Sequence, residues 1–242
     1  MEITIEHRYC GPPESGNGGW VCGTVAASVP TTLGRPSVTV RLSSPPPLDR
    51  PMALEAEPAD GTITLRLVDR GHLVASGTAS ADLVDDVPPT VPLDVARAAE
   101  ARFEGLADHP FPTCFACGTD RDPGEALCLR PGPLDDGTGR YAATWVPREV
   151  SGPLVWAALD CPSGWSAGIA GRPMVLGTMT ARVLALPGAN EPHVIMAWQR
   201  GSEGRKHHSG SALFSPGGEL LGRAEATWVA VDPATVRPEE RS

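Results

Sequence analysis

Several features are scarce or missing in this chain of 242 residues, and each narrows what the protein can be. Lys206 is the only lysine, and acidic side chains outnumber basic ones, which leaves a formal net charge of −9. That charge argues against a general nucleic-acid binder. No apolar run approaches the roughly 20 residues of a membrane helix. The first residues, Met1–Glu6, lack the pattern of a signal peptide, so we expect a cytoplasmic protein without a membrane segment.

Phenylalanine and tyrosine are also rare, whereas glycine and proline are abundant at 27 and 26 residues. This composition indicates many turns rather than long helices. The hydrophobic share of 41% and the charged share of 20% are ordinary for a soluble globular protein. The length allows one large or two modest domains with a substantial core.

The most informative segment is Ser151–Asp160. Ser151 can cap a helix, and Pro153 can occupy the first turn of that helix. The residues that follow are almost all apolar, so we expect the helix to be mostly buried. A carboxylate at Asp160 in such surroundings needs a partner, access to water or a chemical role.

An earlier segment, Ser15–Ala26, has the same layout. Aligning Gly18 with Gly152 puts Ala26 at the position of Asp160. Strand-like segments also repeat in the same order. These pairs are Ser37–Leu42 with Thr178–Leu184, and Gly71–Ala79 with Gly218–Ala226. We therefore predict two copies of one unit, of which only the second has the acid.

The duplication predicts a first unit at residues 1–86, a linker at 87–108 and a second unit at 109–242. The linker opens on an acidic, proline-broken stretch and should contain a short connecting helix. We expect the first unit to open with a strand at Ile3–Tyr9. The second unit should open with a turn of cysteines and a strand at Ala126–Leu129.

The six cysteines raise the possibility of a metal site. Cys114 and Cys117 have the spacing of a zinc knuckle, but a structural zinc ion needs a second ligand pair. Cys128 has no close mate in the sequence, and Cys10 would need His7 as its companion. Cytoplasmic thiols stay reduced. The sequence therefore favours a tight turn with small buried thiols, and we predict no metal and no cofactor.

The ordered repeat of a strand, a glycine-led helix and antiparallel strands resembles the double hotdog fold of acyl-CoA thioesterases, in particular the acyl-CoA thioesterase II type. Asn17–Gly23 resembles the first-half segment in which paired glycines open the central helix. Val155–Asp160 resembles the second-half helix, which carries the catalytic aspartate in that family. The resemblance follows nearly the whole chain in order. It implies an α+β fold in which one continuous antiparallel sheet wraps two central helices.

The same resemblance implies that the substrate is an acyl thioester on coenzyme A or on an acyl-carrier protein. It is compatible with a homo-oligomer formed through the sheets. Neither a nucleic acid nor a membrane is an expected partner.

Asp160 could orient or deprotonate a water molecule, because burial would raise its pKa toward a useful range. The helix opening at Gly18–Trp20 offers backbone N–H groups and the positive end of the helix dipole, which suit an oxyanion hole. Central helices of a hotdog pair run antiparallel, so this opening and Asp160 should meet in one site. The residues predicted to bind substrate are Asn17, Gly18, Gly19 and Trp20.

Thioesterases of the resembled type position their water with a hydroxyl and an amide as well. Thr178, or alternatively Thr180, falls near the position of the hydroxyl, so we predict Thr178 as a second catalytic residue. An ordinary strand threonine is the other interpretation. The matching segment Arg223–Thr227 contains no Gln or Asn, so the chain departs from the family there.

Three functions remain open at this point. The first is a hydrolase of acyl thioesters with Asp160 as general base. The second is another acyl-thioester enzyme, such as a dehydratase or an acyl-transferring biosynthetic enzyme, although His109 precedes Asp160 by more than dehydratases of this fold allow. The third is a catalytically silent acyl-binding protein, favoured if Asp160 is ion-paired and no cavity reaches it. Fold alone does not choose among them.

Overall fold

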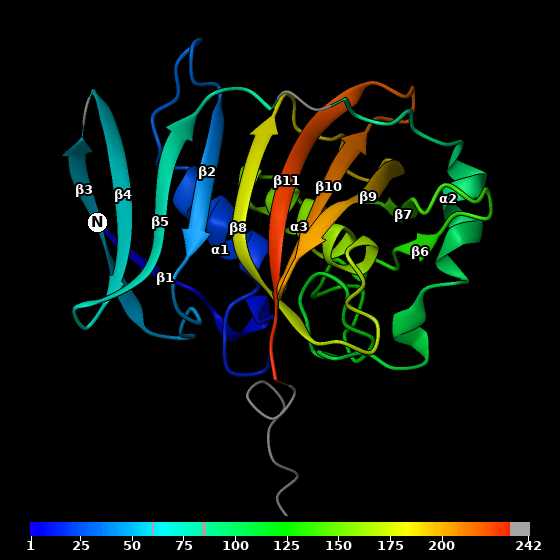
Figure 1. Cartoon of the computed structure of the whole chain (residues 1–242), viewed down its shortest axis with the longest axis horizontal. Coiled ribbons are helices and arrows are strands. Elements are labelled where there is room, and N and C mark those ends of the chain that lie inside the picture. Colours follow the sequence, from blue (N-terminus) through cyan, green and yellow to red (C-terminus); the bar gives the residue numbers. More distant parts are fainter. Residues whose placement is uncertain (60, 84–85, 233–242) are drawn as a thin grey trace, which may run out of the picture.

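Eleven strands form one antiparallel sheet in the computed structural model, which describes residues 1–59, 61–83 and 86–232 (Figure 1). The elements of the first half are β1 Glu2–Thr4, α1 Gly18–Ala26, β2 Ser37–Leu42, β3 Pro51–Ala59, β4 Thr62–Asp69 and β5 His72–Ser80. Those of the second half are α2 Leu93–Glu100, β6 Gly132–Pro133, β7 Tyr141–Trp145, α3 Gly152–Ser166, β8 Met174–Val183, β9 His193–Glu203, β10 Lys206–Phe214 and β11 Leu220–Ala230.

The strand order is β1-β3-β4-β5-β2-β8-β11-β10-β9-β7-β6, so β2 and β8 join the two halves of the sheet. The junction runs from the pair Val38 and Ala181 to the pair Arg41 and Thr178, with antiparallel register. Each half contributes one long helix, and Figure 1 shows α1 and α3 behind the sheet, against the same face. The predicted α+β architecture, a continuous antiparallel sheet with two central helices, is confirmed.

The two central helices cross closely and run antiparallel. A Cβ added at Gly19, at the start of α1, would lie 2.4 Å from the Cβ of Asp160 in the middle of α3. A Cβ added at Gly23 would lie 2.7 Å from the Cα of Pro153, at the start of α3. Glycines at these two positions therefore let the helices touch backbone to backbone.

Local sequence explains why α3 begins where it does. The Ser151 side chain accepts a hydrogen bond from the backbone N–H of Leu154, and a proline occupies the first turn. All residues from Val155 to Ser166 are buried. The prediction of a buried, serine-capped helix is confirmed, and the helix continues six residues beyond Asp160.

Of two expected strands, the one at Ile3–Tyr9 is shorter than predicted, and no strand forms at Ala126–Leu129. The first strand ends at Thr4, because a 3-10 turn at His7–Tyr9 bends the chain toward α1. At Ala126–Leu129 the backbone forms no strand and pairs with the turn at Cys114–Cys117, which we call the cysteine turn. The N–H groups of Leu127 and Leu129 donate to the carbonyls of Phe115 and Ala116. An alternating pattern of apolar and polar residues does not show that a segment will bond to a nearby turn.

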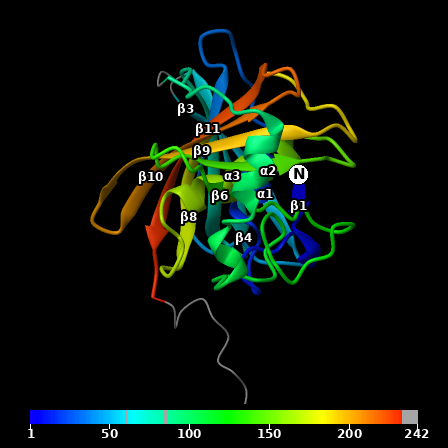
Figure 2. The same ribbon diagram turned by 90° about the vertical axis from the view of Figure 1, so that its right-hand side faces the viewer.

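The segment predicted as a linker contains α2, which packs on β7 near β6 (Figure 2). Ala96 and Ala99 are buried there, and a Cβ at Gly132 would lie 1.9 Å from the carbonyl oxygen of Ala99. Glu100, at the end of the helix, accepts a hydrogen bond from the backbone N–H of Thr144. This segment thus covers a small second core at the end of the sheet.

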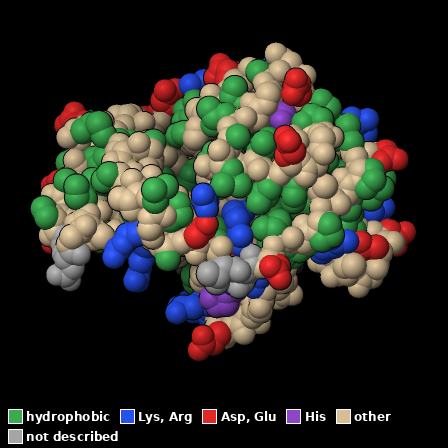
Figure 3. Space-filling view, turned by 90° about the horizontal axis from the view of Figure 1, so that it is seen from above, with side chains coloured by type: hydrophobic (Ala, Val, Ile, Leu, Met, Phe, Trp, Pro, Cys, Tyr) green, Lys and Arg blue, Asp and Glu red, His purple; other side chains and the backbone are tan. Residues whose placement is uncertain are grey.

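The surface seen in Figure 3 intersperses acidic and basic side chains among hydrophobic ones. No helix within the described residues has the length and apolarity required to cross a membrane.

Candidate functional site

Asp160 meets the start of α1 at the centre of the molecule. Its side chain is almost completely buried, with 1% of the residue exposed. Its Oδ2 accepts hydrogen bonds from the backbone N–H of Gly19 at 2.9 Å and from the side-chain amide of Asn17 at 3.2 Å. Its Oδ1 is buried and has no hydrogen-bond partner among the described residues. One carboxylate oxygen is therefore held in place by two donors, and the other has no donor bound to it within the described part of the chain.

Burial raises the pKa of Asp160 to about 7. The nearby Cys114 sulfur adds to this rise, whereas the hydrogen bonds from Gly19 and Asn17 lower the pKa because they favour the charged form. A carboxyl group with such a pKa can accept a proton near neutral pH.

A cavity of about 520 Å³ reaches this carboxylate. Asn17, Gly18 and Asp160 lie on its wall, and Glu14 is the other carboxylate that lines it among the described residues. Apolar side chains make up much of the remaining lining, among them Phe111, Ile169, Met174, Leu176 and Trp228. The volume falls within the range of about 300–1,000 Å³ typical of small-molecule pockets.

The first three backbone N–H groups of α1 differ in their hydrogen bonding. The Gly19 N–H binds Asp160, and the Trp20 N–H donates to Asn17 Oδ1 at 2.9 Å, which caps the helix. The Gly18 N–H has no acceptor among the described residues, and Gly18 lines the cavity. Of the expected oxyanion donors, only the Gly18 N–H is available.

Trp20 lies outside the lining of the cavity. Its ring stacks on that of Tyr9, with centroids 3.7 Å apart and planes inclined by 9°. Trp20 therefore packs against the 3-10 turn that precedes α1.

The structure also leaves Thr178 outside the cavity. The cavity-lining residues of β8 are Met174–Gly177. A β-bulge between Leu176 and Thr178 interrupts the alternation of inward-facing and outward-facing side chains. After Leu176, the next buried side chain is therefore that of Met179 and not that of Thr178. Thr180 is on the same outer face, where its hydroxyl lies 2.9 Å from that of Thr39 at the junction of the two half-sheets. The structure thus brings Asp160 together with Asn17, Gly18 and Gly19, but not with Thr178.

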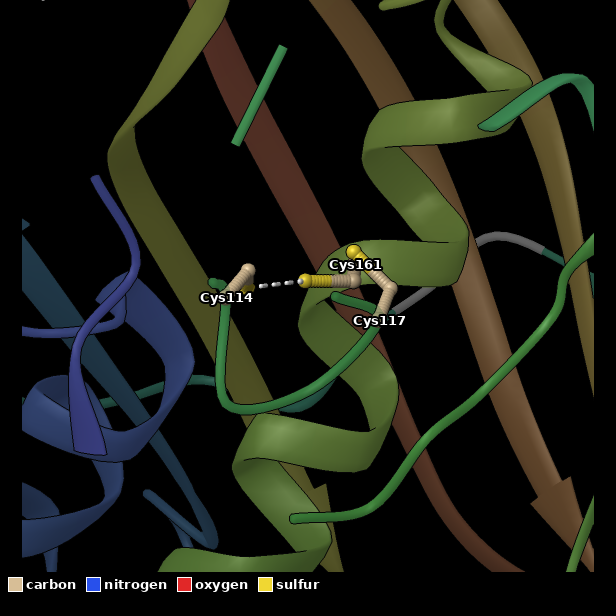
Figure 4. A group of neighbouring side chains, drawn as sticks. All are labelled: Cys114, Cys117 and Cys161. Carbon is tan, nitrogen blue, oxygen red and sulfur yellow. Dashed lines mark hydrogen bonds between the residues drawn. The ribbon is translucent and has the colours of Figure 1, made fainter. Parts of the chain in front are cut away.

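Three cysteines line the same cavity as Asp160, and Figure 4 shows them gathered in one cluster. Cys114 and Cys117 come from one turn, and Cys161 comes from α3. Their sulfur atoms all lie within 4.8 Å of one another, and those of Cys114 and Cys161 are 3.6 Å apart. All three residues are buried and line the cavity. We refer to Cys114, Cys117 and Cys161 as the thiol cluster.

Hydrogen bonds within the thiol cluster separate the pKa values of its members. The hydrogen bonds with Cys117 and Cys161 hold the pKa of Cys114 well below its usual range, despite burial. Burial, followed by the hydrogen bond to Cys114, raises the pKa of Cys117. The hydrogen bonds that Cys161 makes to the other two thiols, followed by burial, raise the pKa of Cys161.

His109 also lines the cavity, but both of its ring nitrogens are engaged. Nδ1 accepts a hydrogen bond from the backbone N–H of Phe111 at 3.0 Å, so the proton resides on Nε2, which lies 3.1 Å from the carbonyl oxygen of Cys117. Burial lowers the pKa of His109. The imidazole therefore supports the cysteine turn and has no free nitrogen for acid–base chemistry.

Sequence reasoning missed Cys161 and His109 as members of this site. Cys161 directly follows Asp160, and a thiol next to a helix acid was the available signal. The contact of α3 with the cysteine turn spans 47 residues of sequence. No spacing rule for zinc knuckles covers such a separation.

No protein-family model and no curated protein sequence matches the chain. Solved structures do match it. A conserved protein with a hot dog fold from Alicyclobacillus acidocaldarius aligns with a TM-score of 0.65 and 20% identity, over 96% of this chain and 93% of the other. A candidate thioesterase II from Thermobifida fusca YX aligns with a TM-score of 0.62 and 13% identity, over 96% and 92%.

An acyl-CoA thioesterase II from Mycobacterium marinum aligns with a TM-score of 0.59 and 14% identity, over 97% of this chain and 93% of that one. The TM-scores and the coverage establish a shared architecture over nearly the full length of each chain, and at such low sequence identity the likeness extends to the fold alone. The continuous sheet, the two antiparallel central helices and these full-length alignments together mean that the chain has the double hotdog fold.

Proposed function

We propose that the chain hydrolyses acyl thioesters, carried on coenzyme A or on an acyl-carrier protein, with Asp160 as general base. The observation that carries the proposal is the buried Asp160 carboxylate on the wall of a largely apolar cavity, fixed there by the N-terminus of the other unit's helix. Asp160 takes part in no ion pair among the described residues. These features favour a reactive group over a structural one.

The chemistry follows from the positions of the atoms. The Gly19 N–H and the Asn17 amide hold Asp160 Oδ2, which leaves Oδ1 to accept a proton from water. The resulting hydroxide adds to the thioester carbonyl. The Gly18 N–H, at the positive end of the α1 dipole, stabilises the oxyanion that forms. The tetrahedral intermediate then collapses, the carbon–sulfur bond breaks, and the thiolate leaves with the proton returned from Asp160.

The apolar part of the cavity suits the acyl chain. Phe111, Leu176 and Trp228 offer surface that an alkyl or aromatic acyl group can cover. Thr178 has no part in this mechanism because it does not line the cavity.

A dehydratase reaction is less consistent with the site. Dehydration of a hydroxyacyl group requires a second acid–base group beside the aspartate, and His109 is the histidine on the cavity wall among the described residues. Both of its nitrogens bind backbone atoms. We therefore retain hydrolysis as the proposed reaction.

The test is the release of free coenzyme A from a panel of acyl-CoAs by wild type and Asp160→Asn. Asparagine is nearly isosteric, so we expect an intact fold and intact acyl-CoA binding, with turnover reduced by at least ~100-fold. Glu14→Gln is the matched control, because Glu14 is the other carboxylate on the cavity wall and its side chain is exposed. This change should leave turnover unchanged. Equal rates for wild type and Asp160→Asn would remove Asp160 from the mechanism. Binding without hydrolysis by wild type would instead identify an acyl-binding protein.

A further inference from the structure

We propose that the thiol cluster of Cys114, Cys117 and Cys161 binds a zinc ion, with its fourth coordination position open to the cavity. This inference concerns metal binding and does not depend on the proposed hydrolysis. The sequence alone favoured no metal because Cys114 and Cys117 lacked further ligands, and α3 supplies the third in Cys161.

The positions of the sulfur atoms fit a tetrahedral ion. With zinc–sulfur bonds of about 2.3 Å, tetrahedral geometry sets sulfur atoms roughly 3.8 Å apart. The sulfurs of Cys114 and Cys161 are 3.6 Å apart, and all three lie within 4.8 Å of one another. Small rotations of the side chains would bring the three sulfurs around one ion.

The backbone presents the first two ligands in a rigid turn. The Gly118 N–H donates to the Cys114 carbonyl at 2.8 Å, and the Cys114 N–H donates to the Phe111 carbonyl at 2.9 Å. A Cβ at position 118 would lie 2.4 Å from the Pro112 carbonyl oxygen, so the turn closes only with glycine there. This Cys-x-x-Cys-Gly turn has the compactness of a zinc knuckle.

The side-chain N–H groups of Asn17 and Trp165 lie next to the sulfur atoms. The Asn17 amide nitrogen lies 3.6 Å from the Cys114 sulfur and 3.8 Å from that of Cys161. The Trp165 indole N–H donates to the Cys117 sulfur at 3.5 Å. The Trp165 N–H thus serves the Cys117 sulfur, and the Asn17 N–H that does not bind Asp160 Oδ2 can serve one of the other two sulfurs. Such donors would stabilise a metal-bound thiolate and orient it.

The fourth position determines the kind of site. Among the described residues, no further His, Cys, Asp or Glu has a ligand atom within 4.8 Å of all three sulfur atoms. The three cysteines all line the cavity, so a water molecule can complete the tetrahedron from that side. Three protein ligands with one open position distinguish a catalytic type of zinc site from a closed structural one.

Metal content provides the first test, and it needs no substrate. Full-length protein is expressed in zinc-supplemented medium, passed over a weak chelator and analysed by inductively coupled plasma mass spectrometry. We expect about one zinc ion per chain for wild type. Cys161→Ser should contain at least ~10-fold less zinc than wild type, since one of three protein ligands is removed. Cys128→Ser is the matched control, because the Cys128 thiol contacts the Arg121 carbonyl outside the thiol cluster and should retain the ion.

A second measurement keeps the proposal testable if the Cys161 variant fails to fold. Wild type stripped with a strong chelator is titrated with Co²⁺, which should produce a thiolate-to-cobalt charge-transfer band that saturates at one equivalent and disappears on addition of Zn²⁺. Failure of stripped, reduced wild type to bind either ion would overturn the proposal. Equal loss of zinc in Cys128→Ser and Cys161→Ser would also overturn it. So would a thiol titration that finds fewer than six thiols in metal-free protein denatured without reductant, because the missing thiols would then form a disulfide.

Discussion

Gly19 shows how one residue type serves both packing and chemistry. Its missing side chain allows the backbone of α1 to approach α3, where an added Cβ would meet Asp160 Cβ at 2.4 Å and the Trp156 carbonyl oxygen at 2.7 Å. That same approach puts the Gly19 N–H within hydrogen-bonding distance of Asp160 Oδ2. The geometry of the carboxylate thus depends on the absence of a side chain opposite it.

Gly19→Ala should therefore destabilise the fold by about 1–3 kcal/mol, the usual cost of forcing an extra group into a packed core. Urea denaturation would measure the change in the free energy of unfolding. Gly34→Ala is the matched control, because a Cβ there meets no atom within 4 Å and should be neutral or slightly stabilising. Equal stability of Gly19→Ala and wild type would contradict the proposed tight contact between the helices.

At the scale of elements, α3 is unusual because it continues through Pro162 in its interior. Proline has no N–H, so the carbonyl of Ala158 loses its usual helical donor. Side chains support the neighbouring turns: the Ser211 hydroxyl of β10 donates to the Leu159 carbonyl at 2.7 Å, and the Ser163 hydroxyl donates to the Asp160 carbonyl at 2.7 Å. The sheet thus stabilises the helix at the turn that carries the candidate site.

This support predicts different effects for two serines of the same strand. Ser211→Ala removes a buried hydrogen bond and should destabilise the protein by about 1 kcal/mol. Ser209→Ala removes a hydroxyl that is equally buried but has no partner among the described residues, so it should be neutral or stabilising. Thermal unfolding of both variants compares them directly. A larger loss for Ser209→Ala than for Ser211→Ala would contradict the role assigned to the Ser211 hydroxyl.

At the scale of the whole molecule, the two halves of the chain differ at matching positions of their central helices. Ala26 in α1 corresponds to Asp160 in α3, and Pro153 corresponds to Gly19 when Gly18 is aligned with Gly152. The second, pseudo-symmetric position therefore lacks both the acid and the N–H that would hold it, since proline has none.

Adding the acid alone should not create a second site. In the Asp160→Asn background, Ala26→Asp should leave acyl-CoA hydrolysis at the level of Asp160→Asn, and circular dichroism would check that the double variant is folded. Recovery of hydrolysis by the double variant would show that the other half can also support the reaction, contrary to this asymmetry.

Local patterns determined much of this architecture in advance. The capped, apolar helix at α3, the glycine-led helix at α1 and the repeated strands follow from interactions between residues close in sequence. Their repeated order resembles the double hotdog fold, and that resemblance implied one antiparallel sheet with two central helices. The same resemblance implied that Asp160 lies near the start of the first helix, because the central helices of a hotdog pair run antiparallel and the start of one meets the middle of the other.

Tertiary structure alone decided the finer composition of the site. A β-bulge moves Thr178 to the outer face of β8, and alternation in the sequence does not reveal a bulge. The hydrogen bonds of Gly19 and Trp20 leave only the Gly18 N–H open to the cavity. Cys161 joins the cysteine turn only because α3 packs against it. Each of these outcomes depends on contacts between segments far apart in the chain, whose distances no local pattern encodes.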